Sequence, residues 1–268
     1  MKEERFYDPI NKRLIYIGSH PSDDFWDTHW AKQDFYSVLE NQHNSLVVKE
    51  SKRFIQQGAK ILEGGCGIGQ NVNALKKCGY DAFGIDFAPK TVALANDYAP
   101  DLKILEGDVR DLPFEDNSFD AYWSLGVIEH FYDGYKKIQS EMNRVIKPGG
   151  FLFLTVPSMS LLRRIKAKLD YYPIWEEDDT LKSNFYQFAI DVENIKIDFE
   201  KNGFVLLKHK PIDGFKGFKD EVFFMRKTLQ KIYSSNLILF KILRRASGVL
   251  LSPFSNHISL YIFKRINN

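Results

Sequence analysis

Short apolar runs alternate with helical patterns of hydrophobic residues between Gly58 and Pro157. The runs that predict strands are AKILEGG, DAFGIDF, LKILEGDV, FDAYWSLGVIEH and GFLFLTVP. Between them, QNVNALKKCG, APKTVALANDYAP and the segment 133–146 predict helices. Strands that alternate with helices indicate βαβ units, and therefore a parallel sheet with helices on both of its faces.

This alternation is absent from the two ends of the chain. The first 58 residues predict helices and irregular chain, and basic helical sequence follows Pro157. Further on, SNFYQFAIDVENIKIDFEKNGF predicts a helix, whereas FVLLKHKPI and HISLYIFKRI predict strands. We expect four parts, which are a helical N-terminal cap at 1–57, a core at 58–157, an inserted basic lid at 158–183, and the remainder of the core at 184–268 with a basic amphipathic insertion at about 215–252.

Composition indicates an ordinary globular protein. The chain has 268 residues, 44% hydrophobic and 27% charged, which is enough to bury a substantial core. The start of the sequence has no apolar stretch typical of a signal peptide, and no run of about 18 apolar residues occurs, so we expect a cytoplasmic protein. Cys66 and Cys78 are isolated from other cysteines and from histidines, which predicts reduced thiols and no zinc site.

Basic residues are concentrated in two segments of a chain whose net charge is only +2. Residues 160–172 contain four basic residues and one acid, and residues 221–251 contain six and one. In the first segment the apolar residues fall at helical spacing. Three interpretations stay open, which are a solvated lid, a surface for an anionic or lipid-linked substrate or a membrane, and a nucleic-acid contact. The acidic remainder of the chain disfavours nucleic acid.

Four glycines lie within the stretch ILEGGCGIGQ, directly after an apolar run and Glu63. Glycine lets the backbone approach a ligand closely and adopts positive φ without strain. In an open α/β sheet, such a loop after the first core strand is typical of a nucleotide site. The third glycine of a dinucleotide fingerprint is replaced by Gln70, and no Gly-Lys-Ser/Thr follows. A nicotinamide-dependent oxidoreductase is therefore disfavoured.

The pattern Glu63-x-Gly65-x-Gly67-x-Gly69 resembles the first motif of the class I S-adenosylmethionine-dependent methyltransferases. Four later stretches resemble the family's next motifs in the same order and spacing, and they are FGIDFAP, EGDVRDLPFEDNSFD, SLGVIEH and RVIKPGG. The resemblance is strongest to the small-molecule branch that includes quinone-biosynthesis methyltransferases, and it covers residues 58–157 well and 184–210 moderately. It implies a Rossmann-like fold with a mostly parallel seven-stranded sheet, an antiparallel last strand, and helices on both faces.

The resemblance also implies which residues contact S-adenosylmethionine. Glu63 and the glycines would hold its amino-acid end, Asp86 would accept hydrogen bonds from the ribose hydroxyls, and Asp108 would meet the adenine amino group. Helix N-capping is the structural alternative for both aspartates. The family more often has a larger residue at the position of Gly64. The full set of expected cofactor contacts is Glu63, Gly65, Cys66, Gly67, Asp86, Phe87, Asp108, Val109, Ser124 and Leu125.

Candidate residues for the acceptor side come from two places in the sequence. His130 ends the fourth strand motif, where the reactive methyl group would lie, and it is a general base, a substrate contact or a residue that orients the loop. Trp26 and Trp30 are four residues apart and predict a helix that either closes over the cofactor or only packs on the core. With His29 they are the candidate substrate contacts. The sequence contains no cluster of acids and histidines near the fourth strand, so we expect no metal site.

We therefore expect methyl transfer from S-adenosylmethionine to a small-molecule acceptor, with S-adenosylhomocysteine as the product. The acceptor class stays open among anionic, saccharide and lipid-linked molecules. The alternative is a non-catalytic S-adenosylmethionine-binding protein that uses its basic segments to dock on a membrane or a partner. The sequence does not predict the oligomeric state or the acceptor atom.

Overall fold

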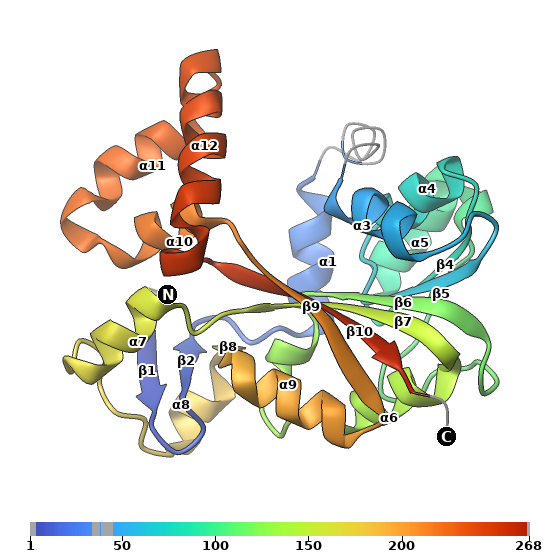
Figure 1. Ribbon diagram of the computed structural model, residues 1–268, viewed down its shortest axis with the longest axis horizontal. Coiled ribbons are helices and arrows are strands. Elements are labelled where there is room, and N and C mark those ends of the chain that lie inside the picture. Colours follow the sequence, from blue (N-terminus) through green and yellow to red (C-terminus); the bar gives the residue numbers. More distant parts are fainter. Residues whose placement is uncertain (1–3, 34–37, 39–44, 267–268) are drawn as a thin grey trace.

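A seven-stranded sheet forms the centre of the computed structural model, which describes residues 4–33, 38 and 45–266 (Figure 1). The strand order is β5-β4-β3-β6-β7-β10-β9. β10 runs antiparallel to both β7 and β9, whereas the other neighbouring pairs are parallel. The predicted Rossmann-like sheet with an antiparallel last strand is confirmed. The strands are β3 (Lys60–Gly64), β4 (Asp81–Asp86), β5 (Ile104–Glu106), β6 (Phe119–Leu125), β7 (Ile146–Pro157), β9 (Phe204–Ile212) and β10 (Ile258–Arg265).

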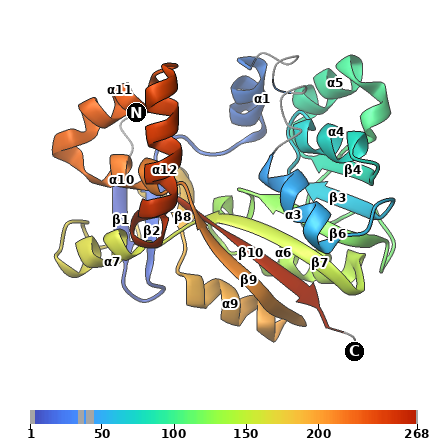
Figure 2. The ribbon, with the colours of Figure 1, turned by 45° about the horizontal axis from the view of Figure 1, so that its top comes forward.

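Helices cover both faces of this sheet (Figure 1, Figure 2). One face carries α3 (Leu46–Phe54), α4 (Gln70–Lys77) and α5 (Pro89–Tyr98), and the other carries α6 (Lys136–Val145) and α9 (Val192–Lys201). Each layer buries its own hydrophobic cluster.

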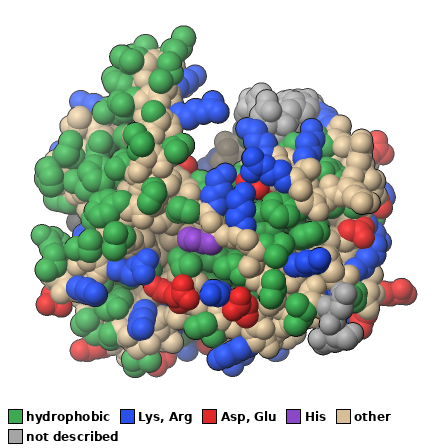
Figure 3. Space-filling view, viewed as in Figure 1, with side chains coloured by type: hydrophobic (Ala, Val, Ile, Leu, Met, Phe, Trp, Pro, Cys, Tyr) green, Lys and Arg blue, Asp and Glu red, His purple; other side chains and the backbone are tan. Residues whose placement is uncertain are grey.

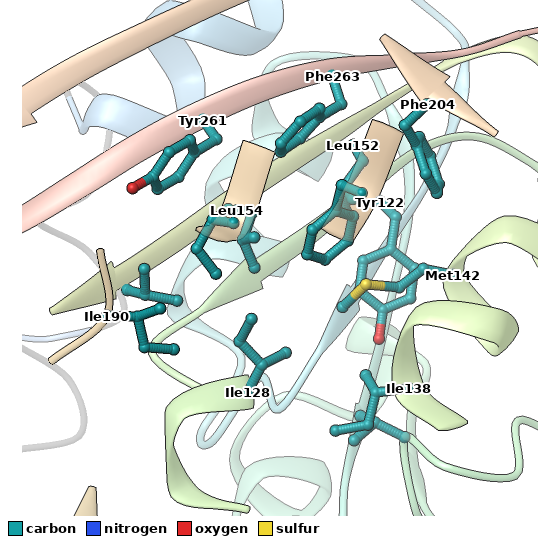
Figure 4. Close-up of a cluster of buried hydrophobic side chains, with 14 of the residues drawn as sticks. Tyr122, Ile128, Ile138, Met142, Leu152, Leu154, Ile190, Phe204, Tyr261 and Phe263 are labelled. Atoms are coloured by element: carbon teal, nitrogen blue, oxygen red, sulfur yellow. The ribbon is translucent and has the colours of Figure 1, made fainter. Parts of the chain in front are cut away.

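In α6 the apolar residues recur at intervals of three or four positions, and this stripe packs against the strands. Figure 4 shows the stripe's Ile138 and Met142 next to Tyr122 of β6, with Phe263 of β10 further along the same cluster. The sheet is therefore buried on both faces, as a parallel sheet requires.

A second, three-stranded antiparallel sheet lies beside the core, and it was not predicted. It contains β1 (Glu4–Asp8), β2 (Arg13–Ile17) and β8 (Phe185–Ala189) in the order β1-β2-β8. The predicted helical cap is therefore wrong for its first part, although α1 (Asp23–Ala31) and α3 are helices. The helix predicted after residue 183 is also wrong at its start, where β8 precedes α9. Residues 34–37 and 39–44 of the predicted cap lie outside the described residues.

The physical reason for these errors is burial on both faces of the small sheet. In β2, Ile15 and Ile17 pack into the main core, while Leu14 and Tyr16 pack into a separate cluster with Tyr172. A strand that is buried on both faces loses the alternation of apolar and polar residues that distinguishes a strand from a helix. Its short apolar run therefore carries no clear periodicity.

One cation of the basic segment at 158–183 is buried in an ion-pair cluster, whereas Arg164 and Lys168 are exposed. Arg163 of α7 (Leu161–Lys168) is 1% exposed, and its Nε donates to Glu221 Oε1 at 2.8 Å. Lys166 Nζ and the Tyr172 hydroxyl donate to Glu221 Oε2 at 2.8 and 2.6 Å. Burial alone would raise the pKa of Glu221, but the surrounding cations lower it to about 2. This ion-pair cluster ties α7 to the C-terminal insertion, and a short helix, α8 (Asp179–Ser183), completes the segment.

The C-terminal insertion consists of helices that stand away from the sheet (Figure 1, Figure 2). They are α10 (Gly214–Glu221), the 3-10 turn η3 (Phe223–Met225), α11 (Arg226–Ser234) and α12 (Ile238–Ser255). Two glycines of α10 let α12 approach closely, because a Cβ on Gly214 would lie 2.2 Å from Ser252 N and one on Gly217 would lie 1.8 Å from Ser255 O. The C-terminal end of α12 is therefore fixed against α10.

Gly64, the departure from the family's first motif, is explained by its neighbour on β6. A Cβ on Gly64 would lie 1.8 Å from the hydroxyl oxygen of Tyr122 and 2.6 Å from its Cζ. Tyr122 is fully buried, and its hydroxyl has no hydrogen-bond partner among the described residues. The glycine therefore provides the space that the tyrosine fills.

Replacing Gly64 by alanine is expected to lower the free energy of unfolding by about 2 kcal/mol, because the new methyl group overpacks the core. Tyr122→Phe removes a buried hydroxyl that has no partner, and is expected to change stability by less than about 1 kcal/mol. In the Gly64→Ala/Tyr122→Phe double variant, part of the loss is recovered. Urea unfolding of the four proteins measures this coupling, and an equal loss with and without the Tyr122 hydroxyl would contradict it.

Candidate functional site

A cavity of about 780 Å³ opens at the carboxyl ends of the central parallel strands. The segments that follow β3, β4, β5 and β6 form one side of it, and they contribute Gly65, Phe87, Gly107 and Gly126. α1, the residues just before it, and the start of α6 form the other sides. In open α/β sheets ligands bind at this edge, so the topology alone makes the cavity the candidate site.

The glycine loop is held against β4 by Asp86. Asp86 Oδ2 accepts a hydrogen bond from Gly67 N at 2.7 Å, and Oδ1 accepts one from Ala88 N at 3.0 Å. Burial raises the pKa of Asp86, although these hydrogen bonds act in the opposite direction. The side chain lines the cavity, and each oxygen keeps a lone pair for a ligand. Asp86 can therefore fix the loop and accept from two hydroxyl groups of a ligand.

Glu63 is a buried carboxyl group with one unused oxygen. Its Oε1 accepts from Asn71 Nδ2 at 2.8 Å, but Oε2 has no partner among the described residues. Burial raises the pKa of Glu63 to about 8, since the hydrogen bond from Asn71 only partly offsets the loss of solvation. An ammonium group bound nearby would supply the missing positive charge.

Asp108 lines the cavity already paired with a cation. Arg110 Nε donates to Asp108 Oδ2 at 2.8 Å, and the Arg110 guanidinium lies 5.2 Å from the ring centroid of Phe131. Burial raises the pKa of Asp108, but the contacts with Arg110 outweigh it and the pKa is lowered. An adenine amino group at this position would share the carboxylate with Arg110.

Two tryptophans of α1 lie over the cavity. Trp26 and Trp30 both line it, and a Cβ on Gly67 would come within 2.4 Å of Trp30 Cζ2, so the indole rests on the glycine loop. α1 is anchored by Asp27, whose Oδ1 accepts from both the backbone N–H and the hydroxyl of Thr91 in the first turn of α5, each at 2.8 Å. The helix is therefore fixed across the site rather than loosely attached.

His130 lies at the end of the 3-10 turn η2 (Ile128–His130) and also lines the cavity. Its Nδ1 lies 2.7 Å from the carbonyl oxygen of Tyr186, which can only accept, so Nδ1 carries the proton and Nε2 has the free lone pair. Burial lowers the pKa of His130 to about 4, and the hydrogen bond to Tyr186 only partly opposes this. The imidazole is therefore neutral at pH 7. Its neighbour Glu129 is buried, and burial raises the pKa of that carboxyl to about 8.

Three lysines at the cavity were not anticipated from the sequence. Lys136 and Lys137 occupy the first turn of α6, which contains no acidic residue, and Lys182 comes from α8. Lysine is unfavourable at a helix N-terminus because of the helix dipole. The unusual placement of Lys136 and Lys137 was a usable signal, whereas Lys182 reaches the site only through the fold.

The predicted site residues divide into two groups by position, and their roles as cofactor or substrate contacts stay predictions. Those that line the cavity are Trp26, Trp30, Gly65, Asp86, Phe87, Asp108, Val109, Leu125 and His130. Those that do not are His29, Glu63, Cys66, Gly67 and Ser124.

The side chains of this second group lie on the exposed surface or in the core. His29 is exposed on α1. The thiol of Cys66 packs into the core beside Gly84, and Ser124 is fully buried in β6. Within the described part of the chain, no group of three or more histidines, cysteines or acids could hold a metal ion.

Three comparisons with known proteins bear on this site. Residues 62–154 match the family model described as a methyltransferase domain. The chain is 30% identical over 179 residues to a demethylmenaquinone methyltransferase of Staphylococcus aureus, covering 60% of this chain and 73% of that relative.

Solved structures share the fold at lower identity. A putative sarcosine dimethylglycine methyltransferase from Galdieria sulphuraria aligns with a TM-score of 0.56 at 17% identity. The alignment covers 91% of this chain and 99% of that chain. Phosphoethanolamine N-methyltransferase 2 of Haemonchus contortus, in complex with S-adenosyl-L-methionine, aligns with a TM-score of 0.57 at 18% identity, over 90% of this chain and 57% of that chain.

The geometry of the residues at the cavity can be compared with the groups of S-adenosylmethionine. Asp86 offers two acceptor positions for a pair of hydroxyl groups, and Glu63 has a buried oxygen that lacks a donor. Gly65 has a φ of 72° and lines the cavity, where it exposes backbone and no side chain. A ligand with a ribose would satisfy the two acceptor positions of Asp86, whereas Glu63 does not line the cavity and its unpartnered oxygen is fully buried.

Proposed function

This chain belongs to the class I S-adenosylmethionine-dependent methyltransferases, and from that premise we propose that its acceptor is a small molecule with an anionic group and an apolar body. The enzyme uses S-adenosylmethionine as its methyl donor and releases S-adenosylhomocysteine. The acceptor is the part that the family does not determine, because methyltransferases with different acceptors share the cofactor half of the fold.

The observation that carries the anionic part of the proposal is the lysine group at the cavity. Lys136 and Lys137 lie in the first turn of α6, where their charges and the exposed N–H groups of the helix add to one positive field. Lys182 lines the same cavity, but its Nζ lies 3.8 Å from carboxylate oxygens of both Asp133 and Glu177, so the field comes mainly from Lys136 and Lys137. A carboxylate or phosphate of the acceptor would offset this charge.

The apolar part of the proposal rests on the aromatic lining. Trp26 and Trp30 come from α1, and Phe131, Tyr132 and Phe185 come from the opposite side of the cavity. Aromatic side chains favour flat or extended apolar groups. The Staphylococcus aureus relative is named for a quinone substrate, which is in keeping with an apolar ring in this chain's acceptor.

Catalysis in this site depends mainly on position. When bound, S-adenosylmethionine supplies a methyl group that its sulfonium already activates. Asp86 and the glycine loop would hold the donor, and the tryptophans of α1 would exclude water and press the acceptor into line. Holding two reactants in line lowers the barrier by several kcal/mol without any chemical step by a side chain.

His130 is the candidate base for an acceptor that must lose a proton. Its Nδ1 proton is engaged by the Tyr186 carbonyl, so Nε2 would take the proton from the acceptor as the methyl group is transferred. Because burial keeps the imidazole neutral, Nε2 is available throughout the neutral pH range.

The acceptor class is tested with a metabolite extract separated on an anion-exchange column. The purified enzyme is expected to release S-adenosylhomocysteine with the retained, anionic fractions. Lys136→Ala/Lys137→Ala is expected to raise the KM for the acceptor in the active fraction at least tenfold, with little change in kcat. Release only with the unretained fractions contradicts an anionic acceptor. Cofactor binding without release from any fraction favours a non-catalytic binding protein instead.

His130→Gln is expected to lower kcat about a hundredfold, while the Kd for S-adenosylmethionine changes less than threefold. His209, an exposed histidine of β9 outside the cavity, provides the control His209→Gln. In the wild type the pKa of His130 is about 4, so kcat is expected to stay constant from pH 8 to pH 6 and to fall only in more acid solution. An unchanged kcat in His130→Gln, or an acid limb centred near pH 6.5, contradicts this role.

A further inference from the structure

The apolar side chains of α12 face solvent instead of a core. Ile238, Leu239, Ile242, Val249 and Leu250 are 62–78% exposed. Leu243 is 44% exposed, and Ala246 is exposed as well. In an ordinary surface helix such residues are turned inward.

These residues recur at intervals of three or four, so they form one continuous stripe along a helix of 18 residues, about 27 Å long. Buried residues of α12 are confined to its C-terminal end, at Ser252 and Ser255, where α10 holds it. The N-terminal part projects from the molecule, and Figure 3 shows it covered by hydrophobic side chains.

A second exposed apolar element precedes α11. Phe223 and Phe224 of η3 are 81% and 87% exposed, and Arg226 and Lys227 follow after Met225. Figure 3 shows further hydrophobic side chains on the same upper left part of the molecule, where Figure 1 places α11 and α12. An exposed apolar area of this extent, on an insertion outside the sheet, indicates a surface that binds another protein or a membrane.

The charge of the segment distinguishes between these partners. From residue 222 to residue 251 the chain contains six basic residues and no acid. Lys241 and Arg245 follow Ile238 and Ile242 by three positions, so they border the apolar stripe. A second copy of this chain would bring the same six positive charges against these, with no acid in either segment to pair with them. A partner that complements this surface therefore combines an apolar interior, for the stripe of α12, with anionic groups, for the bordering lysines and arginines.

We propose that η3, α11 and α12 form a docking surface for an anionic lipid bilayer. The stripe of α12 enters the boundary between headgroups and acyl chains, with the helix lying along the bilayer, and the lysines and arginines contact lipid phosphates. Among the helices that the structure describes, none combines the length and the apolar composition that a bilayer-spanning segment requires. This inference does not depend on the acceptor proposed above.

Vesicle sedimentation of the full-length protein tests the proposal. At low salt the protein is expected to pellet with vesicles of equimolar phosphatidylcholine and phosphatidylglycerol, and to stay in solution with phosphatidylcholine alone or at high salt. Ile242→Ser/Leu250→Ser is expected to lower the partition coefficient more than tenfold. Lys241→Ser/Arg245→Ser is expected to lower it roughly thirtyfold at low salt.

Ile10→Ser provides the matched control. Ile10 is 88% exposed in the turn between β1 and β2, away from α12, and its replacement is expected to leave vesicle binding unchanged. All altered side chains are exposed, and an unchanged circular dichroism spectrum and melting temperature verify that each variant is folded.

Three results overturn the proposal. The first is a wild type that stays in solution with the anionic vesicles, and the second is an equal loss of vesicle binding in Ile10→Ser and Ile242→Ser/Leu250→Ser. The third is a protein that does not bind vesicles but forms a dimer in analytical ultracentrifugation, which Ile242→Ser/Leu250→Ser abolishes. The third result would assign the surface to a second copy of the chain. Methyl transfer is not measured in any of these experiments, so their outcome is separate from that of the proposed acceptor.

Discussion

The hydrogen bond from Gly67 N to the carboxylate of Asp86 is the contact on which the site depends. It joins the loop after β3 to the end of β4, and β3 is the strand from which the chain order runs outward in both directions, to β4 and β5 on one side and to β6 and β7 on the other. The loop can lie this close because Gly65, Gly67 and Gly69 all have positive φ. The backbone N–H groups of Gly65 and Cys66 add two hydrogen bonds to the carbonyl oxygen of Ile85, and Trp30 rests on the loop at Gly67.

The two halves of the cavity are held by different interactions. The cofactor half comes from the ends of parallel strands, and the hydrogen bonding of the sheet fixes its geometry. The acceptor half comes from α1, α6 and the segment before β8, which lie on separate stretches of the chain. Asp27 secures α1 to α5, and the Tyr186 carbonyl secures His130. Glu221 joins α7 to the insertion further from the cavity. The proposed acceptor half is therefore held by side-chain contacts between separate segments, and the proposed cofactor half by the sheet.

The sequence predicted the main sheet well because the signal there is local. Each βα unit combines an apolar run, a glycine or aspartate at the strand end, and a helix with apolar spacing, and the motifs fall in order along the chain. β2 and β8 were missed because they pair across about 170 residues, and because β2 is buried on both faces and so shows no alternation of apolar and polar residues. β1 pairs with β2 in a local hairpin. The buried ion pair of Arg163 was not predicted because its partner, Glu221, is 58 residues away. In the site, the residues at strand ends could be named in advance, whereas Lys182 and Phe185 could not, since only the fold brings them to the cavity.

Calorimetric titration with S-adenosylmethionine tests the central claim most directly. The wild type is expected to bind one molecule per chain, and Asp86→Asn, which keeps the size of the side chain and removes its charge, is expected to bind at least tenfold more weakly. Asp81→Asn, at the exposed start of the same strand, is expected to bind like the wild type. Absence of saturable binding by the folded wild type, or equal affinity in Asp86→Asn, would contradict the assignment of this cavity to the cofactor.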